Sequence, residues 1–240
     1  MQIKNSTAIV TGANRGLGRA LVDALLNQGA AKIYATARSQ KSLGELELIS
    51  PKITPVLLEV TDPGQIAELA GRTKDATLLI NNAAILDFGA ALESEQKTIE
   101  HNLEVNLFGL LNLTRAIAPN IAKNDGGAVV NILTLLSLAS MPAITPYNIS
   151  KAAAWSLTLS LRAELAASNI SVHSVFPGAI DTDMIAGVEM DKTAPRDVAA
   201  AIVEGINQDK EDIFPDAMAQ QVYQAWSKDH KAVEKQFASM

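Results

Sequence analysis

The stretch Thr11-Gly12-Ala13-Asn14-Arg15-Gly16-Leu17-Gly18-Arg19-Ala20 follows the first apolar run of the chain and leads into a helical pattern. Glycines between a strand and a helix let the backbone turn tightly and let a pyrophosphate approach it closely. The start of the helix offers free N–H groups and a positive dipole end to phosphates. The spacing is G-x-x-x-G-x-G, not the commoner G-x-G-x-x-G, and a purely structural turn is the alternative. Its position directly after a strand favours a nucleotide-binding turn.

The rest of the chain alternates between short apolar runs and helical patterns. Runs such as Leu78-Leu79-Ile80 and Val129-Val130-Asn131-Ile132 are almost continuously apolar, which is typical of parallel strands covered on both faces. Strand–helix alternation builds a doubly wound sheet through right-handed crossovers. We therefore expect an α/β fold with one domain over residues 1–240: a Rossmann-type parallel sheet of about seven strands with helices on both faces.

The expected elements follow from these patterns. Strands are predicted at Thr7–Thr11, Lys32–Ala37, Thr54–Val60, Ala76–Asn81, Ala128–Leu133, Ser171–Phe176 and, as a short edge, Ile213-Phe214. Helices are predicted at Gly16–Gln28, Leu43–Ile49, Pro63–Arg72, Thr98–Lys123, Tyr147–Ser168 and Pro195–Asn207, with a helical tail from Ala217. The segment Asp181–Thr193 is the least regular and is expected to form a mobile lid.

Composition excludes several classes of function. The net charge of -6 argues against a nucleic-acid or anionic-membrane surface. The absence of cysteine excludes disulfides and thiolate chemistry, and the three histidines lack partners at metal-ligand spacing, so no metal site is expected. Without a secretory signal or a membrane-length apolar run, we expect a cytoplasmic protein.

Tyr147 and Lys151 stand one helical turn apart in an apolar helix, so they share a face. An ammonium about 4 Å from a phenol would lower the phenol pKa by about three units, toward neutrality, where proton transfer is most effective. The alternative is a core tyrosine next to a surface lysine.

Further motifs occur in order along the chain: Asn81-Asn82-Ala83-Ala84 after a strand, Asn106 inside a long apolar helix, and Pro177-Gly178 after the sixth strand. With the glycine-rich turn and the Tyr147–Lys151 pair, they make residues 4–184 resemble the short-chain dehydrogenases/reductases in their single-domain form. Ala84 departs from the glycine usual in that family.

The resemblance implies four catalytic residues: Asn106, Thr134, Tyr147 and Lys151. Tyr147 exchanges a proton with the substrate, Lys151 lowers its pKa and binds ribose, and Asn106 holds a water that links Lys151 to solvent. The family serine that binds the substrate oxygen falls on Thr134, 13 positions before Tyr147. Threonine offers the same hydroxyl. Ser137 lies nearby and stays open as a stand-in.

We expect NADP(H) as the cofactor. NAD enzymes of this architecture place an acidic residue at the end of the second strand, but here Ala37 and Arg38 stand there, and Arg15 is also basic. Two guanidinium groups on one phosphate would favour NADP; solvated surface arginines are the alternative. The expected cofactor-binding residues are Gly12, Asn14, Arg15, Gly16, Leu17, Gly18, Arg38, Glu59, Val60, Asn81, Ala83, Tyr147, Lys151, Pro177, Gly178, Ile180 and Thr182.

The sequence thus predicts an NADP(H)-dependent oxidoreductase that interconverts a small carbonyl compound and an alcohol. Apolar residues over 135–141 and 184–190 suggest an apolar substrate pocket. A non-catalytic dinucleotide-binding regulator is the alternative, and a nucleotide-sugar epimerase would need a larger substrate domain. By resemblance, Thr98–Lys123 and Tyr147–Ser168 pair between subunits of a homodimer or homotetramer.

Overall fold

The computed structural model describes residues 1–240 and contains one seven-stranded parallel sheet, which confirms the predicted fold class. The strand order is β3-β2-β1-β4-β5-β6-β7, so the chain winds outward from β1 in one direction, returns to β4 and continues in the other. The strands are β1 (Thr7–Val10), β2 (Lys32–Ala37), β3 (Ile53–Leu57), β4 (Leu78–Asn81), β5 (Gly127–Ile132), β6 (Ile170–Val175) and β7 (Asp212–Ile213). The reversal between β1 and β4 is the place where this architecture binds ligands.

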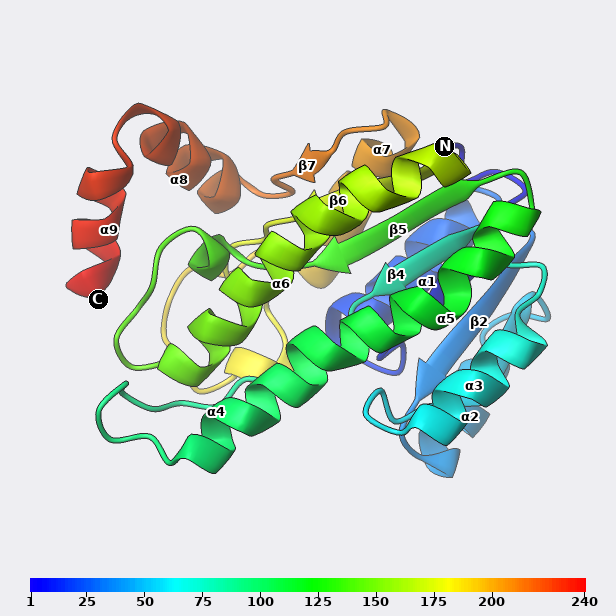
Figure 1. The fold of residues 1–240 in the computed structure, drawn as a ribbon, viewed down its shortest axis with the longest axis horizontal. Coiled ribbons are helices and arrows are strands. Elements are labelled where there is room, and N and C mark those ends of the chain that lie inside the picture. The colour runs from blue at the N-terminus through cyan, green and yellow to red at the C-terminus, as the bar shows by residue number, and fades with distance from the viewer.

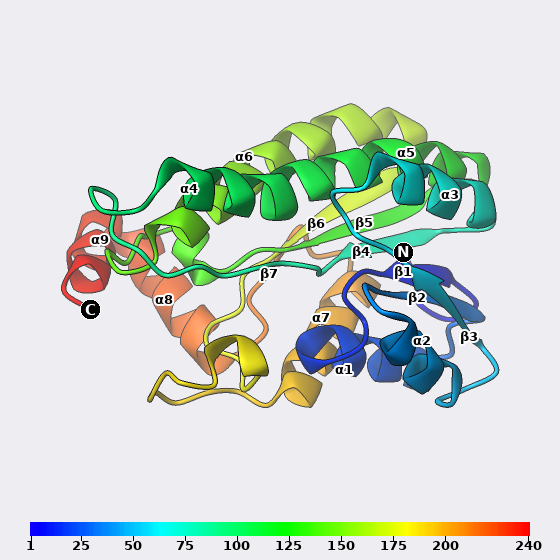
Figure 2. The ribbon, with the colours of Figure 1, turned by 90° about the horizontal axis from the view of Figure 1, so that it is seen from below.

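Helices cover both faces of the sheet. In Figure 2, α3 (Pro63–Arg72), α4 (Gln96–Leu103), α5 (Leu110–Lys123) and α6 (Thr145–Leu165) lie above it, whereas α1 (Gly16–Asn27), α2 (Gln40–Glu47) and α7 (Pro195–Asn207) lie below. Successive strand residues point to opposite faces: Leu78 and Ile80 join one apolar cluster, and Leu79 joins the other. This explains why the strand sequences are continuously apolar.

The predicted helix Thr98–Lys123 is wrong as one regular element, because a π-helical turn at Glu104–Gly109 separates α4 from α5. Asn106 lies in this turn, and its side chain exchanges two hydrogen bonds with the backbone of Ile85, of 2.9 and 3.0 Å. Gly109 packs against Val60 so closely that a Cβ would lie 3.0 Å from the valine Cγ2. Single π turns occur often at functional sites.

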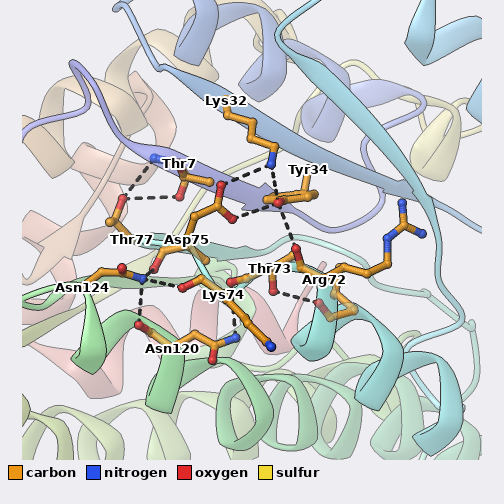
Figure 3. Close-up of polar contacts among 12 residues, drawn as sticks. Thr7, Lys32, Tyr34, Arg72, Thr73, Lys74, Asp75, Thr77, Asn120 and Asn124 are labelled. Carbon is orange, nitrogen blue, oxygen red and sulfur yellow. Dashed lines mark hydrogen bonds and ion pairs between the residues drawn. The ribbon is translucent and has the colours of Figure 1, made fainter.

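A polar cluster ties the elements together at the amino ends of the strands (Figure 3). The Tyr34 hydroxyl donates to Asp75 over 2.8 Å and accepts from Lys32, which also pairs with Asp75 at 3.2 Å. Asn124, the C-cap of α5, donates to the carbonyl oxygens of Lys74 and Ala76. These contacts fix β2, the loop before β4 and α5 at the edge remote from the carboxyl ends of the strands.

Two helices, α8 (Ala217–Lys228) and α9 (His230–Ala238), follow β7 and lie beyond the carboxyl end of β5 in Figure 1. Five aromatic rings connect α8 to the core: Trp155, Phe176, Phe214, Tyr223 and Trp226, each with its neighbour within 4.0–6.4 Å between centroids. The C-terminal pair therefore packs on the body of the molecule, as an extension of it. None of the helices is long and apolar enough to span a membrane.

Candidate active site

A cleft of about 390 Å³ opens at the carboxyl ends of the strands. It brings together nearly all the residues that the sequence singled out. Those that line it are Gly12, Asn14, Arg15, Gly16, Leu17, Gly18, Arg38, Glu59, Val60, Ala83, Thr134, Tyr147, Lys151, Pro177, Gly178, Ile180 and Thr182. The two exceptions, Asn81 and Asn106, line a separate small cavity behind the cleft.

The glycine-rich turn forms one end of this cleft. Gly12 and Gly16 have φ values of 64° and 53°, which favour glycine, and a Cβ on Gly18 would lie 2.1 Å from the Gly12 carbonyl oxygen. Helix α1 begins at Gly16, and its N-cap, Arg15, makes no capping bond through its side chain. The first N–H groups of α1 are therefore left without a side-chain cap. The turn fits a dinucleotide pyrophosphate.

Thr11 and Asn82 lock the turn to the neighbouring strand. The Thr11 hydroxyl accepts hydrogen bonds from the backbone N–H groups of Asn82 and Ala83, both 2.9 Å, and the Asn82 amide donates to the Thr11 carbonyl over 2.8 Å. These bonds join the carboxyl ends of β1 and β4, the two strands between which the winding reverses. The part of the Asn81–Ala84 motif that follows β4 thus shapes the cleft floor.

Tyr147 and Lys151 point into the cleft from α6, with the Lys151 Nζ 5.7 Å from the centroid of the tyrosine ring. Both side chains are buried, and the ammonium donates to the Ile132 carbonyl over 2.8 Å. Burial lowers the pKa of Lys151 to about 8 and raises the pKa of Tyr147 above its usual value of 10.

The expectation that Lys151 brings the Tyr147 pKa near neutrality is therefore wrong for the protein without a ligand. Desolvation disfavours the phenolate, and the ammonium is bonded to a backbone carbonyl instead of to the phenol oxygen. In this environment Tyr147 is a protonated phenol at neutral pH, which is a proton donor.

Asn106 and Lys151 meet at the small cavity, whose volume is about 10 Å³, room for roughly one water molecule. The Asn106 amide is already occupied, because its nitrogen donates to Ile85 O and to Ser150 Oγ and its oxygen accepts from Ile85 N. The Asn81 Oδ1 is buried and has no hydrogen-bond partner. The cavity therefore offers space and polar groups for one water next to Lys151.

Thr134 and Ser137 are placed differently. Thr134 follows β5 and lines the cleft together with Tyr147, and its hydroxyl caps a short 3₁₀ turn by accepting from Leu136 N over 3.3 Å. Ser137 does not line the cleft, and its hydroxyl is buried without a hydrogen-bond partner. The geometry favours Thr134 over Ser137 as the hydroxyl that a bound substrate meets.

The two arginines expected to bind a phosphate both line the cleft, but each faces a carboxylate. Arg15 Nη1 lies 3.0 Å from Asp183 Oδ2, and Arg38 Nη1 lies 3.9 Å from Glu59 Oε2. The side chains of both arginines are well exposed, so these ion pairs contribute at most about 1 kcal/mol each. Such weak pairs leave both guanidinium groups available to a ligand.

Sequence reasoning missed Asp216, which connects the cleft to the C-terminal helices. Its Oδ1 accepts from Ala219 N over 2.8 Å and caps α8, while its Oδ2 accepts from Gly178 N over 2.9 Å. An aspartate before a helix is a recognisable N-cap signal. Nothing local to the sequence indicates that its second oxygen reaches the Pro177-Gly178 turn.

The fold, the glycine-rich turn and the Tyr-Lys pair in one cleft define a nucleotide-dependent oxidoreductase class, and comparison with known proteins gives the family. The short chain dehydrogenase family model matches residues 6–193. The chain belongs to the short-chain dehydrogenase/reductase family of oxidoreductases.

Its relatives carry several activities. The chain is 31% identical to a 3-oxoacyl-[acyl-carrier-protein] reductase of Thermotoga maritima over 77% of this chain and 78% of that protein. It is 28% identical to an uncharacterised oxidoreductase of Staphylococcus saprophyticus over 87% of this chain and 94% of that protein. A crystal structure of a short chain dehydrogenase from Burkholderia cenocepacia in complex with NADP superposes with a TM-score of 0.93, at 38% identity over 99% of both chains.

Proposed function

We propose that the protein catalyses hydride transfer between NADP(H) and a carbonyl compound or alcohol. The observation that carries this proposal is the placement of Tyr147, Lys151 and Thr134 on the wall of one cleft whose other end is the glycine-rich turn. When bound, NADP(H) supplies the hydride that the protein side chains cannot provide. The residues that would hold it are those of the predicted cofactor set that line the cleft, whereas Asn81 lines the small cavity.

The side chains have distinct roles in this proposal. Tyr147, which burial keeps protonated, donates its hydroxyl proton to the carbonyl oxygen of the substrate, and Thr134 donates a hydrogen bond to the same oxygen. Lys151 places a positive charge beside the phenol and stabilises it as it loses its proton. Asn106 shapes the cavity in which one water connects Lys151 to the interior. A buried phenol that begins as an acid is suited to carbonyl reduction.

The preference for NADP over NAD rests on charge. No acidic residue occupies the end of β2 at Ala37 and Arg38, and Arg15 and Arg38 both reach the cleft. One charge-assisted bond to a 2′-phosphate contributes about 1.5–3 kcal/mol, which is roughly a ten- to hundredfold preference. The NADP complex of the Burkholderia structure supports this choice. A lower KM for NADH than for NADPH would overturn it.

A non-catalytic dinucleotide-binding protein is the competing function, and one variant separates the two. Tyr147→Phe removes the donated proton while keeping the ring, so an enzyme should lose about 10²–10⁴-fold in turnover with unchanged NADPH affinity. Turnover is measured as the rate of NADPH oxidation with a panel of ketones and aldehydes. NADPH affinity is measured from the change in nucleotide fluorescence on binding. Wild-type protein that binds NADPH but reduces no member of the panel would favour the regulator.

We further propose one catalytic domain over residues 1–240, a cytoplasmic location, and a homodimer or homotetramer formed through the helices of the α5–α6 face. Apolar side chains on this face are exposed: Phe108 at 44%, Ile149 at 40% and Leu159 at 46%. An apolar exposed face favours burial against a second copy. A monomer mass by light scattering would contradict the oligomer.

A further inference from the structure

Methionine is concentrated in the lining of the cleft, and the part of the lining that these side chains form is called the methionine-rich end. The chain has six methionines, and five of them line the cleft: Met141, Met184, Met190, Met218 and Met240. They come from four segments far apart in sequence, namely the loop before α6, the segment between β6 and α7, the start of α8 and the end of the chain. Methionine is flexible and polarisable, so a methionine-lined surface adapts to apolar ligands of different shape.

The C-terminal helix α9 closes this end of the cleft. Phe237 is buried, lines the cleft, and packs with Ala139 and Val233 in a small apolar cluster that also holds Trp226 of α8. Figure 1 shows α8 and α9 beyond the carboxyl end of β5, across from the segment that follows β6 (yellow). Helix α8 is held to the Pro177-Gly178 turn by Asp216. The wall is thus built on anchored helices.

Few charged side chains line the cleft. Its charged lining side chains are Arg15, Arg38, Glu59, Lys151 and Asp183. Four of these form the two ion pairs beside the glycine-rich turn and β2, and the ammonium of Lys151 is bonded to Ile132 O. None of the five methionine side chains can pair with a carboxylate or phosphate of a substrate. An uncompensated charge there would meet a large desolvation penalty.

Given the proposed hydride transfer, on which this inference rests, we propose that the methionine-rich end, closed by α9 through Phe237, selects uncharged apolar ketones or aldehydes of varied shape. It would reject oxo acids, sugars and polyols, whose charges and hydroxyl groups find no partners there. The substrate class follows from the lining side chains of the described residues and from the anchoring of α9.

Binding tests the proposal without depending on turnover. Titration calorimetry with the NADPH-loaded Tyr147→Phe variant would measure 1-tetralone and 2-decanone, which differ in shape, against pyruvate and dihydroxyacetone. We expect both apolar ketones to bind at least about tenfold more tightly than the polar ones, since each additional 1.4 kcal/mol of apolar burial gives a factor of ten. Equal or tighter binding of pyruvate or dihydroxyacetone would overturn the proposal.

The wall is tested by Phe237→Ala in the same background. It should weaken the binding of the apolar ketones by about tenfold or more and leave NADPH affinity unchanged, because it removes apolar contact area from the cleft wall. Lys235→Ala, on the exposed side of α9, is the matched control and should change neither. Unchanged ketone affinity in a folded Phe237→Ala protein would contradict the role of α9.

A second variant covers the case in which Phe237→Ala loosens α9. Met184→Gln with Met190→Gln adds polar groups from an irregular segment, where both side chains are about two-fifths exposed, so folding should be unaffected. Apolar ketones should bind several-fold more weakly, and unchanged binding would count against the proposal. Turnover by the wild type distinguishes the proposed function from the proposed substrate class. If apolar ketones bind but are not reduced, only the proposed function is refuted. If polar substrates are reduced and apolar ones are not, only the substrate class is refuted.

Discussion

Replacing Lys151 by methionine should reveal how much stability the protein loses by burying this ammonium. The Lys151 side chain is buried, and its pKa falls from 10.5 to about 8 because burial penalises the charged form. A shift of about 2.5 units corresponds to about 3.4 kcal/mol of differential stability between the two protonation states. Met keeps the length of the side chain and removes the charge.

The sign of the effect follows from the lowered pKa of a base. Below about pH 8 both the folded and the unfolded lysine are protonated, and the desolvation penalty is fully present. Between about pH 8 and 10.5 the unfolded lysine still holds its proton while the folded one has lost it, so folding releases a proton and stability rises with pH. The raised pKa of Tyr147 acts in the opposite direction, but only above about pH 10, where the unfolded phenol ionises first.

The assay is urea unfolding followed by circular dichroism at several values between about pH 7 and 9.5, on wild type and Lys151→Met. The free energy of unfolding of the wild type, relative to that of the variant, should increase by about 2 kcal/mol over this range. The range extends about 1.5 pH units above the folded pKa, and each of these units contributes about 1.36 kcal/mol. Lys235→Met, at an exposed lysine, should show no such change. A pH-independent difference between wild type and Lys151→Met would refute the inference that the ammonium is desolvated.

Three further predictions concern the cleft. Asp216→Ala removes the α8 cap and the bond to Gly178 N. The free energy of unfolding, measured in urea, should fall by about 1–2 kcal/mol, and the KM for NADPH, measured from initial rates, should rise. An unchanged KM would show that Asp216 does not position the Pro177-Gly178 turn for the cofactor. Thr134→Ala should lower kcat about a hundredfold while Ser137→Ala leaves it nearly unchanged, and the reverse order would reassign the hydroxyl. Arg38→Ala should raise the KM for NADPH by about tenfold or more and leave that for NADH almost unchanged; equal effects on both cofactors would exclude a 2′-phosphate contact.

Local patterns were sufficient to predict the fold class, and the family resemblance of the motifs predicted most of the cleft residues. Residues of the glycine-rich turn are adjacent in sequence, and Tyr147 and Lys151 are one turn apart, so their proximity follows from helix geometry alone. A doubly wound parallel sheet follows from strand–helix alternation, whereas the strand order comes from the structure. The strands pair over long distances in the sequence, but each strand and helix carries its own local pattern, and for this reason the fold class could be predicted.

Features that depend on burial or on distant contacts could not be predicted in the same way. The pKa of Tyr147 is raised, whereas the sequence predicted a lowered pKa. The sequence-based argument included the charge of the neighbouring lysine but not the desolvation that the folded core imposes. Asn106, in the π turn, bonds to Ile85, which lies 21 positions away. Asp216 reaches Gly178 across 38 positions, and no periodicity encodes that contact.

Lys151 occupies the boundary between the two spaces of the site, and this explains why a charge is kept where burial disfavours it. It is a lining residue both of the main cleft and of the small cavity shared with Asn81 and Asn106. An ammonium has three N–H donors, and Ile132 O accepts from one of them. Two donors are left, and in the proposed function they are available to a water in the cavity, where the buried Asn81 Oδ1 has no partner, and to a ligand in the cleft. A neutral side chain would cost less to bury, but it would remove the one cation that lines both spaces.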